Sequence, residues 1–289
     1  MDPLALALVI AGALCHASWN LISKKVGGGL YFVALYGLVS SLLCLPLALQ
    51  AWYAHPAPLG LTAWAAIGAS ALIHAVYSLI LQRGYRAADF SLVYPLARGS
   101  GPLFSVVGAV LLLGEAPGAT GLAGIAAILL GILLLSGLAE VRRSPRLRAG
   151  IFWGGLTGLS IAAYTVLDGW AIKVLGLAPL LYYGLSLLVR NLLLLPQALR
   201  RRDLLLAEWR GKWRAIVAVG ILSPLAYSLV LIALTRAPLS YVAPLRELSM
   251  LGGVLLGSRL LQEKISPLRG LGIAGMLLGA GLLALAKPG

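Results

Sequence analysis

Four charged side chains lie deep inside apolar stretches of the sequence: Arg98, Arg190, Arg246 and Glu247. An ionisable group in the hydrocarbon of a membrane costs several kcal/mol, so it must face a partner, a protein interior or a water-filled cavity. Counted along helices that rise about 1.5 Å per residue, Arg98 and Glu247 both approach the middle of the membrane. These residues are therefore the first candidates for chemistry.

Guanidinium and carboxylate groups at this depth have two interpretations. In the functional one, Arg98 or Arg246 binds a substrate carboxylate, while Glu247 binds an ammonium group or carries a proton. In the structural one, Glu247 forms a salt bridge with Arg98 or Arg190 that holds two parts of the protein together. A salt bridge that breaks when substrate binds is consistent with both interpretations. Arg190, which is followed by Asn191, is more typical of helix packing.

Aromatic and polar side chains at similar depth offer the wall of a binding site. His74 precedes Tyr77 by three residues, so both lie on roughly the same helical face. A lone buried histidine is either a hydrogen-bonded packing residue or a ligand and proton carrier. The other candidate wall residues are Trp19, Asn20, Tyr94, Tyr164 and Tyr241. The alternative for these aromatics is the membrane interface. Asp168 lies near the outer end of the sixth span, where we expect Lys173 to neutralise it.

The elements that must position these residues are transmembrane helices. Of 289 residues, 60% are apolar and 11% are Asp, Glu, Lys or Arg, too few charges to cover a water-facing surface. Crossing the hydrocarbon takes about 20 apolar helical residues. Because the apolar runs are continuous and lack the alternation of barrel strands, we predict an all-α membrane protein with ten transmembrane helices. The predicted spans are 4–23, 30–52, 63–82, 90–113, 118–138, 149–170, 178–199, 215–235, 240–260 and 267–286.

The chain also matches itself at an offset near 150 residues. Residues 77–81 (Tyr-Ser-Leu-Ile-Leu) recur as residues 227–231 (Tyr-Ser-Leu-Val-Leu). This duplication divides the chain into two five-helix repeats, residues 1–143 and residues 144–289. Because five is odd, the second repeat enters the membrane from the opposite side, and the two form a 5+5 inverted repeat. Such halves can open a shared site to either side in turn, which predicts a transporter that works by alternating access.

The duplication relates the deep charges to one another. Pro95 matches Pro244, so Arg98 falls opposite Arg246 or Glu247, and helices related by the two-fold axis should bring these charges face to face. We also expect the fourth span to be interrupted around Arg98, because helix-weakening residues surround it, namely Pro95, Gly99, Gly101 and Pro102. A broken helix near the midplane frees backbone groups that can bind substrate.

With these features the chain resembles the drug/metabolite transporter superfamily, specifically its ten-helix EamA-type branch. The motifs that carry the resemblance are Trp19-Asn20 in the first span, Tyr164-Thr165 in the sixth, and the sequences Leu-Gly-Glu115 and Leu-Gln-Glu263. The resemblance implies a secondary carrier in a bacterial-type cytoplasmic (inner) membrane. It further implies export of amino acids or related metabolites, as by the aromatic and broad-range amino-acid exporters. Members of the family commonly place both termini in the cytoplasm.

Other classes of function fit the sequence less well. Enzyme motifs such as His-Glu-x-x-His, Gly-x-Ser-x-Gly and the Walker loop are absent, so we assign no catalytic residue and keep an intramembrane enzyme as a distant alternative. The closer alternative is an exporter of amphipathic drugs. We expect no metal and no cofactor, because no Cys/His spacing suits a metal. The expected partners are a small-molecule substrate, a coupled proton and the lipid bilayer, without nucleic acid, and one chain that holds both halves favours a monomer.

The formal net charge of +14 is distributed unevenly over the connections between spans. Of the Lys and Arg residues, 17 lie in the odd-numbered connections and 3 in the even-numbered connections and the C-terminal tail. By the positive-inside rule the odd connections face the cytoplasm, which puts both termini outside. A reporter that is active only in the cytoplasm should stay silent when fused after Gly289 and give a signal when fused after Arg143. A signal from the Gly289 fusion would refute this topology.

Overall fold

The computed structural model describes residues 1–27, 29–54, 59–88, 90–135, 146–252 and 266–287. The elements formed by these residues are helices, which confirms the predicted all-α class. In chain order they are α1 (Pro3–Val26), α2 (Leu30–Ala54), α3 (Leu61–Ala87), α4 (Phe90–Leu113), α5 (Ala119–Leu135), α7 (Leu147–Lys173), α8 (Pro179–Leu199), α9 (Arg202–Leu234), α10 (Leu239–Arg246) and α12 (Pro267–Leu285).

Length and composition allow most of these helices to cross a membrane. Among the described residues, eight helices are long and apolar enough, and α5 is a shorter apolar helix of 17 residues. Large apolar side chains remain exposed on them, for example Leu111 at 74% and Leu14 at 63%, as expected where lipid replaces water. The expected ninth span, residues 240–260, lies partly outside the described residues, so the count of ten spans stays a prediction.

Local sequence signals explain several helix boundaries. Helices α8 and α12 begin with a proline, whose fixed φ and missing N–H suit the first turn. Helices α1 and α4 are followed by Gly27 and Gly114, which adopt positive φ values of 61° and 67°. Only glycine takes this left-handed conformation without strain, so these residues end the helices and let the chain turn back.

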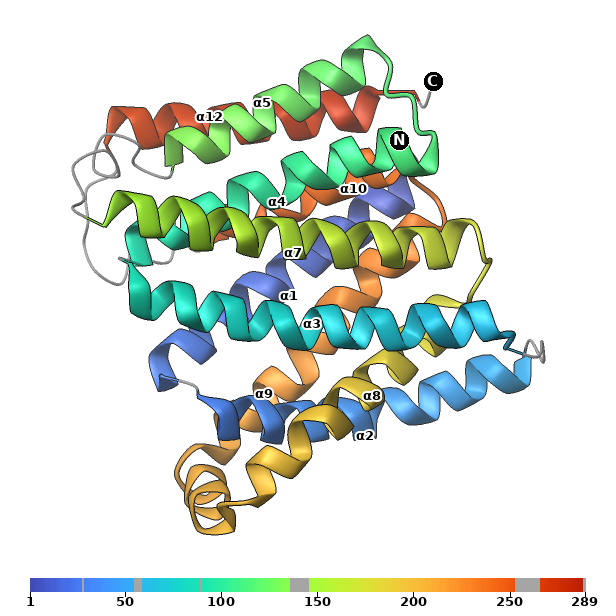
Figure 1. The fold of residues 1–289 in the computed structure, drawn as a ribbon. Coiled ribbons are helices and arrows are strands. Elements are labelled where there is room, and N and C mark those ends of the chain that lie inside the picture. Colours follow the sequence, from blue (N-terminus) through green and yellow to red (C-terminus); the bar gives the residue numbers. More distant parts are fainter. Residues whose placement is uncertain (28, 55–58, 89, 136–145, 253–265, 288–289) are drawn as a thin grey trace.

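Successive helices run in opposite directions, so their ends gather on two faces of the bundle (Figure 1). The N- and C-terminal ends lie close together on the right of Figure 1, on the side that we call the termini face. The opposite side, the basic face, holds the helix ends that carry Lys25, Arg83, Arg86, Arg146, Arg148, Arg200, Arg201, Arg202 and Arg269. The uneven charge of the connections is therefore a difference between two faces of the folded protein.

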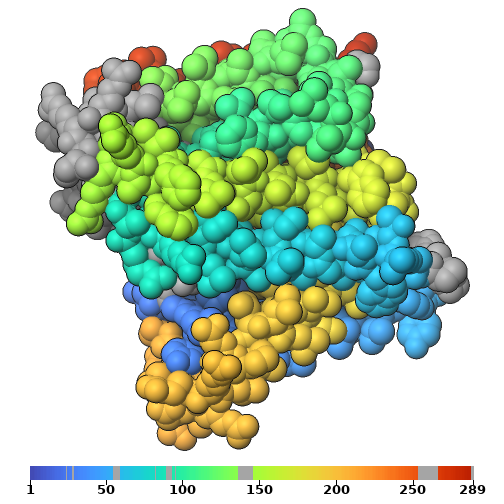
Figure 2. All heavy atoms as spheres, in the orientation of Figure 1, coloured from blue at the N-terminus to red at the C-terminus, as the bar shows by residue number. Residues whose placement is uncertain are grey.

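The helix pairs repeat in a pattern that a two-fold axis would produce. If α1 to α5 correspond in order to α7, α8, α9, α10 and α12, three pairs join a helix to its own counterpart: α2 with α8, α4 with α10, and α5 with α12. The most extensive of the remaining contacts come in exchanged pairs, such as α1 with α9 and α3 with α7. The space-filling view shows α3, α7 and α4 lying side by side as parallel bands (Figure 2).

Four glycines let α5 and α12 approach closely. A methyl group added to Gly279 would lie 2.6 Å from the carbonyl oxygen of Gly124, and one added to Gly131 would lie 2.7 Å from that of Gly272. In the sequence repeat, Gly124 corresponds to Gly272 and Gly131 to Gly279. The two contacts are thus equivalent to each other, and the backbones meet where any side chain would separate them.

The helix interruption expected near Arg98 occurs in the other half of the protein. Helix α4 runs through Arg98 without a break, so this expectation was wrong. Helix α10 instead ends at Arg246, and the backbone N–H of Glu247 donates to the carbonyl of Pro244 in a tighter i to i+3 turn. Pro244 lacks the N–H that would continue the regular helical ladder. Arg246 and Glu247 therefore lie where the helix ends.

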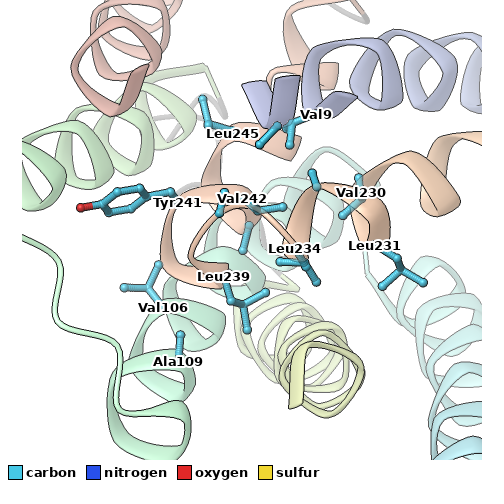
Figure 3. Packing of buried hydrophobic residues seen from close by; sticks show 14 of the residues in the cluster. Val9, Val106, Ala109, Val230, Leu231, Leu234, Leu239, Tyr241, Val242 and Leu245 are labelled. Carbon is cyan, nitrogen blue, oxygen red and sulfur yellow. The ribbon is translucent and has the colours of Figure 1, made fainter. Parts of the chain in front are cut away.

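Buried apolar side chains pack around the end of α9 and the start of α10 (Figure 3). Leu234, Leu239 and Val242 are at most 2% exposed, and Val9 of α1 and Val106 of α4 belong to the same cluster of buried residues. This packing holds the start of α10 in place and so positions the two charged residues at its end.

Polar contacts tie the elements together at the termini face. The carboxylate of Glu115, just after α4, accepts the backbone N–H groups of Leu239 (2.7 Å) and Ser240 (2.8 Å) at the start of α10. This acceptor satisfies two N–H groups that have no partner inside the helix. Lys173 pairs with the same carboxylate at 3.3 Å.

The N-terminus contributes further contacts on this face. The Met1 ammonium donates to the carbonyl of Ala286 (2.7 Å), and Asp2 pairs with Arg236 (3.3 Å). The backbone N–H of Leu4 donates to the exposed Asp2 carboxylate, which holds the pKa of Asp2 below its ordinary value.

Substitution of a glycine at the contact between α5 and α12 should separate the two helices. We expect Gly279→Ala to destabilise the protein by about 1–3 kcal/mol, because its methyl group overlaps the backbone of α5. The matched control is Gly281→Ala on the same helix, where the methyl group meets nothing within 4 Å. Thermal unfolding in detergent measures both variants. Equal melting temperatures for the two would contradict the close approach.

Candidate charge cluster

The deepest charges of the sequence meet in the structure. Nη1 of Arg98 donates to both carboxylate oxygens of Glu247, at 3.2 and 3.4 Å, and the side chains are 11% and 1% exposed. The residues are 149 positions apart, the same offset that aligns Pro95 with Pro244. The salt bridge considered from the sequence therefore exists, and it joins equivalent positions of the repeat.

Arg246 is the neighbouring group with unfilled hydrogen-bonding capacity. It is 4% exposed, and its Nε lies 3.6 Å from Oε1 of Glu247, which is too long for a hydrogen bond. Within the described residues, its Nε and Nη2 have no hydrogen-bond partner. Leaving a buried donor unsatisfied costs about 1–3 kcal/mol. An acceptor brought by a ligand would remove this cost.

His16 of α1 is a member of the site that the sequence did not reveal. Its Nε2 is hydrogen-bonded to Nη2 of Arg98. Because a guanidinium only donates, Nε2 must be the acceptor, so the ring is neutral and carries its proton on Nδ1. The ring also contacts Trp19 edge-on, with centroids 5.0 Å apart. We define His16, Arg98, Arg246 and Glu247 as the charge cluster.

An aromatic group borders the charge cluster. The His74 ring stacks on Tyr164 with centroids 4.0 Å apart, and Tyr227 and Tyr77 approach edge-on at 5.7 Å from His74 and 5.8 Å from Tyr164. Tyr164 lies within electrostatic range of Arg246. We define His74, Tyr77, Tyr164 and Tyr227 as the aromatic cluster. Three of its members were site candidates from the sequence, and Tyr227 is the repeat counterpart of Tyr77.

Asp168 of α7 is a second buried carboxylate. It is 1% exposed and accepts hydrogen bonds from the hydroxyl groups of Tyr182 (2.6 Å) and Tyr227. The expected neutralisation by Lys173 was wrong, because Lys173 lies at the end of α7 and pairs with Glu115. Phenols therefore take the place that the sequence assigned to a cation.

The other candidates from the sequence have different surroundings. The Arg98 guanidinium lies over the Tyr94 ring at 5.5 Å, so Tyr94 adjoins the charge cluster. Asn20 donates to the backbone carbonyl of His16 within its own helix. Tyr241 is fully buried, donates to the carbonyl of Lys287 at the end of the chain (3.2 Å), and points away from the α9–α10 turn in Figure 3. The structure places Tyr241 near the termini face.

Two hollows differ in their lining. A cavity of about 10 Å³, with room for roughly one water molecule, is lined by Ala71, His74, Tyr183, Ser186, Leu187 and Arg190. A larger groove of about 580 Å³ runs along α4 and α7 between apolar side chains such as Phe104 and Leu159, which are exposed. Its apolar lining suits lipid chains. The small cavity is the one that borders the aromatic cluster.

Comparisons with known proteins agree with this architecture. The profile of the EamA-like transporter family matches residues 3–137 and 148–285. The chain also superposes on a solved crystal structure of a protein with a TM-score of 0.74 at 16% identity, covering 97% of this chain and 96% of the other. At that identity the similarity extends to the fold alone. No curated protein matches the chain.

Neutralising the central ion pair should reveal its energetic role. We expect Glu247→Gln to cost about 3–5 kcal/mol, because Arg98 then remains as a buried charge without its counterion. The double variant Arg98→Gln, Glu247→Gln should recover much of that loss. Thermal unfolding of both single variants and the double variant measures this coupling. Additive losses in the double variant would show that the two side chains do not depend on each other.

Proposed function

The chain belongs to the EamA-like transporter family, and from that premise we propose that it is a secondary carrier that exports amino acids by alternating access. It is an integral membrane protein and a transporter of small molecules, as the family and the apolar helices indicate. The substrate class, the cytoplasmic (inner) membrane, the outside location of both termini and the monomeric state are parts of the proposal.

The proposed mechanism rests on two five-helix repeats, residues 1–143 and 144–289, inserted in opposite directions. The exchanged helix pairs and the two equivalent glycine contacts between α5 and α12 support this arrangement. Halves related by such an axis have two near-equivalent ways of packing, each of which opens the site to one side. The charge cluster lies where equivalent helices α4 and α10 meet, so either motion would alter access to it.

The observation that carries the proposal is the buried guanidinium of Arg246. Arg98 is already engaged by Glu247 and His16, which leaves Arg246 as the better of the two candidates for binding a substrate carboxylate. A guanidinium presents parallel N–H groups that match the two oxygens of a carboxylate. A substrate carboxylate that accepts from the buried Nε and Nη2 would remove the free-energy cost of burying these donors without a partner. The unsatisfied donors therefore support a carboxylate contact at Arg246.

The balance of buried charge favours an anionic group on the substrate. The described parts of the spans contain three guanidiniums and two carboxylates, namely Arg98, Arg190, Arg246, Asp168 and Glu247. A lipophilic cation entering this region would add to the excess positive charge, whereas a carboxylate would offset it. The ammonium group of an amino acid can be received by the aromatic cluster, since cations bind the faces of tyrosine rings.

An exporter of amphipathic compounds is the second candidate. The aromatic cluster and the stacked pair of His74 and Tyr164 favour it, because aromatic walls accept flat apolar molecules of many kinds. Its substrates would not need a carboxylate. The two candidates therefore differ in their dependence on Arg246.

Arg246→Lys tests the proposed carboxylate contact. Lysine keeps the charge and loses the two-pronged geometry, so we expect phenylalanine to bind about ten- to hundred-fold more weakly, from the 1.5–3 kcal/mol of a charge-assisted hydrogen bond. Titration calorimetry on purified protein measures the affinity. Phenethylamine, which lacks the carboxylate, should bind weakly to the natural protein and be insensitive to the substitution.

The matched control is Arg190→Lys, the same change at another arginine within the spans. It should leave phenylalanine affinity nearly unchanged if Arg246 is the contact. Weakening by Arg190→Lys alone would move the contact to Arg190. Equal binding of phenylalanine, phenethylamine and tetraphenylphosphonium would instead favour the exporter of amphipathic compounds.

A further inference from the structure

The beginning of α9 forms a short helix of its own. Lys212 has non-helical backbone angles, φ −134° and ψ 17°, so the helix bends there. The part from Trp213 to Leu234 already extends about 33 Å at 1.5 Å per residue, enough to cross the hydrocarbon of a membrane. Residues 202–211, which we call the α9 N-terminal segment, therefore lie outside the hydrocarbon core.

The α9 N-terminal segment lies crosswise on the basic face. Figure 1 shows it in gold at the lower left, nearly end-on, whereas the spanning helices run within the plane of the picture. Leu205 packs against the buried cluster that includes Phe32 and Ile216. Glu208 pairs with Lys212 at 2.8 Å, which ties the segment to the bend. These contacts fix the segment at the edge of the membrane, across the direction of the spans.

Large apolar side chains stay exposed on and beside this segment. Leu206 is 54% exposed and Trp209 is 38% exposed, and Trp213, just beyond the bend, is 49% exposed. The Arg214 guanidinium lies over the Trp213 ring at 5.5 Å. Tryptophan is enriched where a protein meets the boundary between hydrocarbon and water, because its ring is apolar and its N–H is polar. The exposed side chains therefore suit a membrane surface.

Helical spacing sets arginines beside the exposed apolar side chains. Arg202, Leu206 and Arg210 follow one another at intervals of four residues, and Trp209 follows Leu206 by three. All four therefore lie on roughly one side of the segment. At the boundary of a bilayer, leucine and tryptophan can enter between acyl chains while the long arginine side chains reach up to the phosphate groups.

The charge of this region determines which headgroup it attracts. Residues 200–214 hold six Lys and Arg residues against two acidic ones, and one of the acidic residues, Glu208, is already paired with Lys212. The ion pairs formed by the described residues include none of Arg200, Arg201, Arg202 and Arg210. Guanidinium groups bind phosphate oxygens in parallel pairs of hydrogen bonds. Such a cluster is attracted to a membrane surface with net negative charge.

We propose that the α9 N-terminal segment is an interfacial helix that binds anionic phospholipids. Arg202 and Arg210 hold the lipid phosphate, and Leu206 and Trp209 enter the acyl-chain region beside it. A zwitterionic lipid has the same phosphate, but its own ammonium group offsets the charge that attracts the arginines. The proposal depends on a chain that spans the membrane, and on neither the class of substrate nor the direction of transport.

Lipid binding is measured by native mass spectrometry of the full-length protein, released from detergent with added phosphatidylglycerol or phosphatidylcholine. We expect the natural protein to bind phosphatidylglycerol more tightly than phosphatidylcholine. The double variant Arg202→Gln, Arg210→Gln should weaken the tightest phosphatidylglycerol site by about thirty-fold, or about five-fold for each arginine. Its affinity for phosphatidylcholine should change little.

The matched control makes the same change in charge elsewhere on the basic face. Arg83→Gln, Arg148→Gln replaces two exposed arginines on α3 and α7 and should leave the tightest site nearly unchanged. Equal weakening by both double variants would overturn the assignment, because any arginine of the basic face would then serve. Equal affinity for the two lipids would overturn it as well. A dimer in detergent that Leu206→Ser converts to a monomer would assign this side of the segment to a second copy of the chain instead.

The orientation of the segment is tested with a nitroxide label in nanodiscs that contain phosphatidylglycerol. The label is attached at Leu206→Cys or Leu204→Cys in a chain whose Cys15 and Cys44 are replaced by alanine. Two residues along a helix lie on nearly opposite sides, and Leu204 is exposed as well, at 40%. We expect oxygen, which dissolves in lipid, to relax the label at position 206, and a water-soluble nickel complex to relax the label at position 204. Preferential relaxation of the label at position 206 by the nickel complex would contradict insertion of this side.

Discussion

Burial of charge near the middle of the membrane is the constraint on which the rest of the structure depends. Arg98 and Glu247 have almost no access to water, so α4 and α10 must approach closely enough to pair them at 3.2 Å. Their positions are equivalent in the sequence repeat, 149 residues apart. Two identical subunits would place like charges opposite each other here, whereas a fused chain can hold an arginine in one half and a glutamate in the other. Fusion thus allows an attractive pair where the repeats meet.

Close backbone packing supports that meeting point from both sides. Glycines bring α5 against α12, and in α2 and α8 the equivalent residues Ser41 and Asn191, 150 positions apart, are joined by a hydrogen bond. Packing and interhelical hydrogen bonds must supply this cohesion, because lipid is as apolar as the helix surfaces. Arg246 differs from these paired residues, because it lies at the end of α10 and two of its buried N–H groups have no acceptor. Unfilled hydrogen-bonding capacity of this kind is typical of binding sites.

The sequence predicts those parts of the structure that depend on composition and order along the chain. Apolar runs predict the helices, and the repeat predicts that Arg98 meets its counterpart. His16 escaped prediction because its role comes from a hydrogen bond across helices, which leaves no periodic signal. Asp168 was assigned to Lys173, five residues away, because sequence reasoning favours near neighbours, whereas phenols from two other helices hold it. The break was predicted in α4 because helix-weakening glycines and prolines surround Arg98 there, whereas the helix that ends is α10, at Arg246.

Exchange of the central charges tests most directly whether the two halves meet through equivalent positions. The measurement is the melting temperature of Arg98→Glu, Glu247→Arg and the double variant in the same detergent. Each single variant places like charges together and should be strongly destabilised. If the positions are equivalent and in contact, the double variant restores an attractive pair and recovers most of the melting temperature. A double variant no more stable than either single variant would contradict the account.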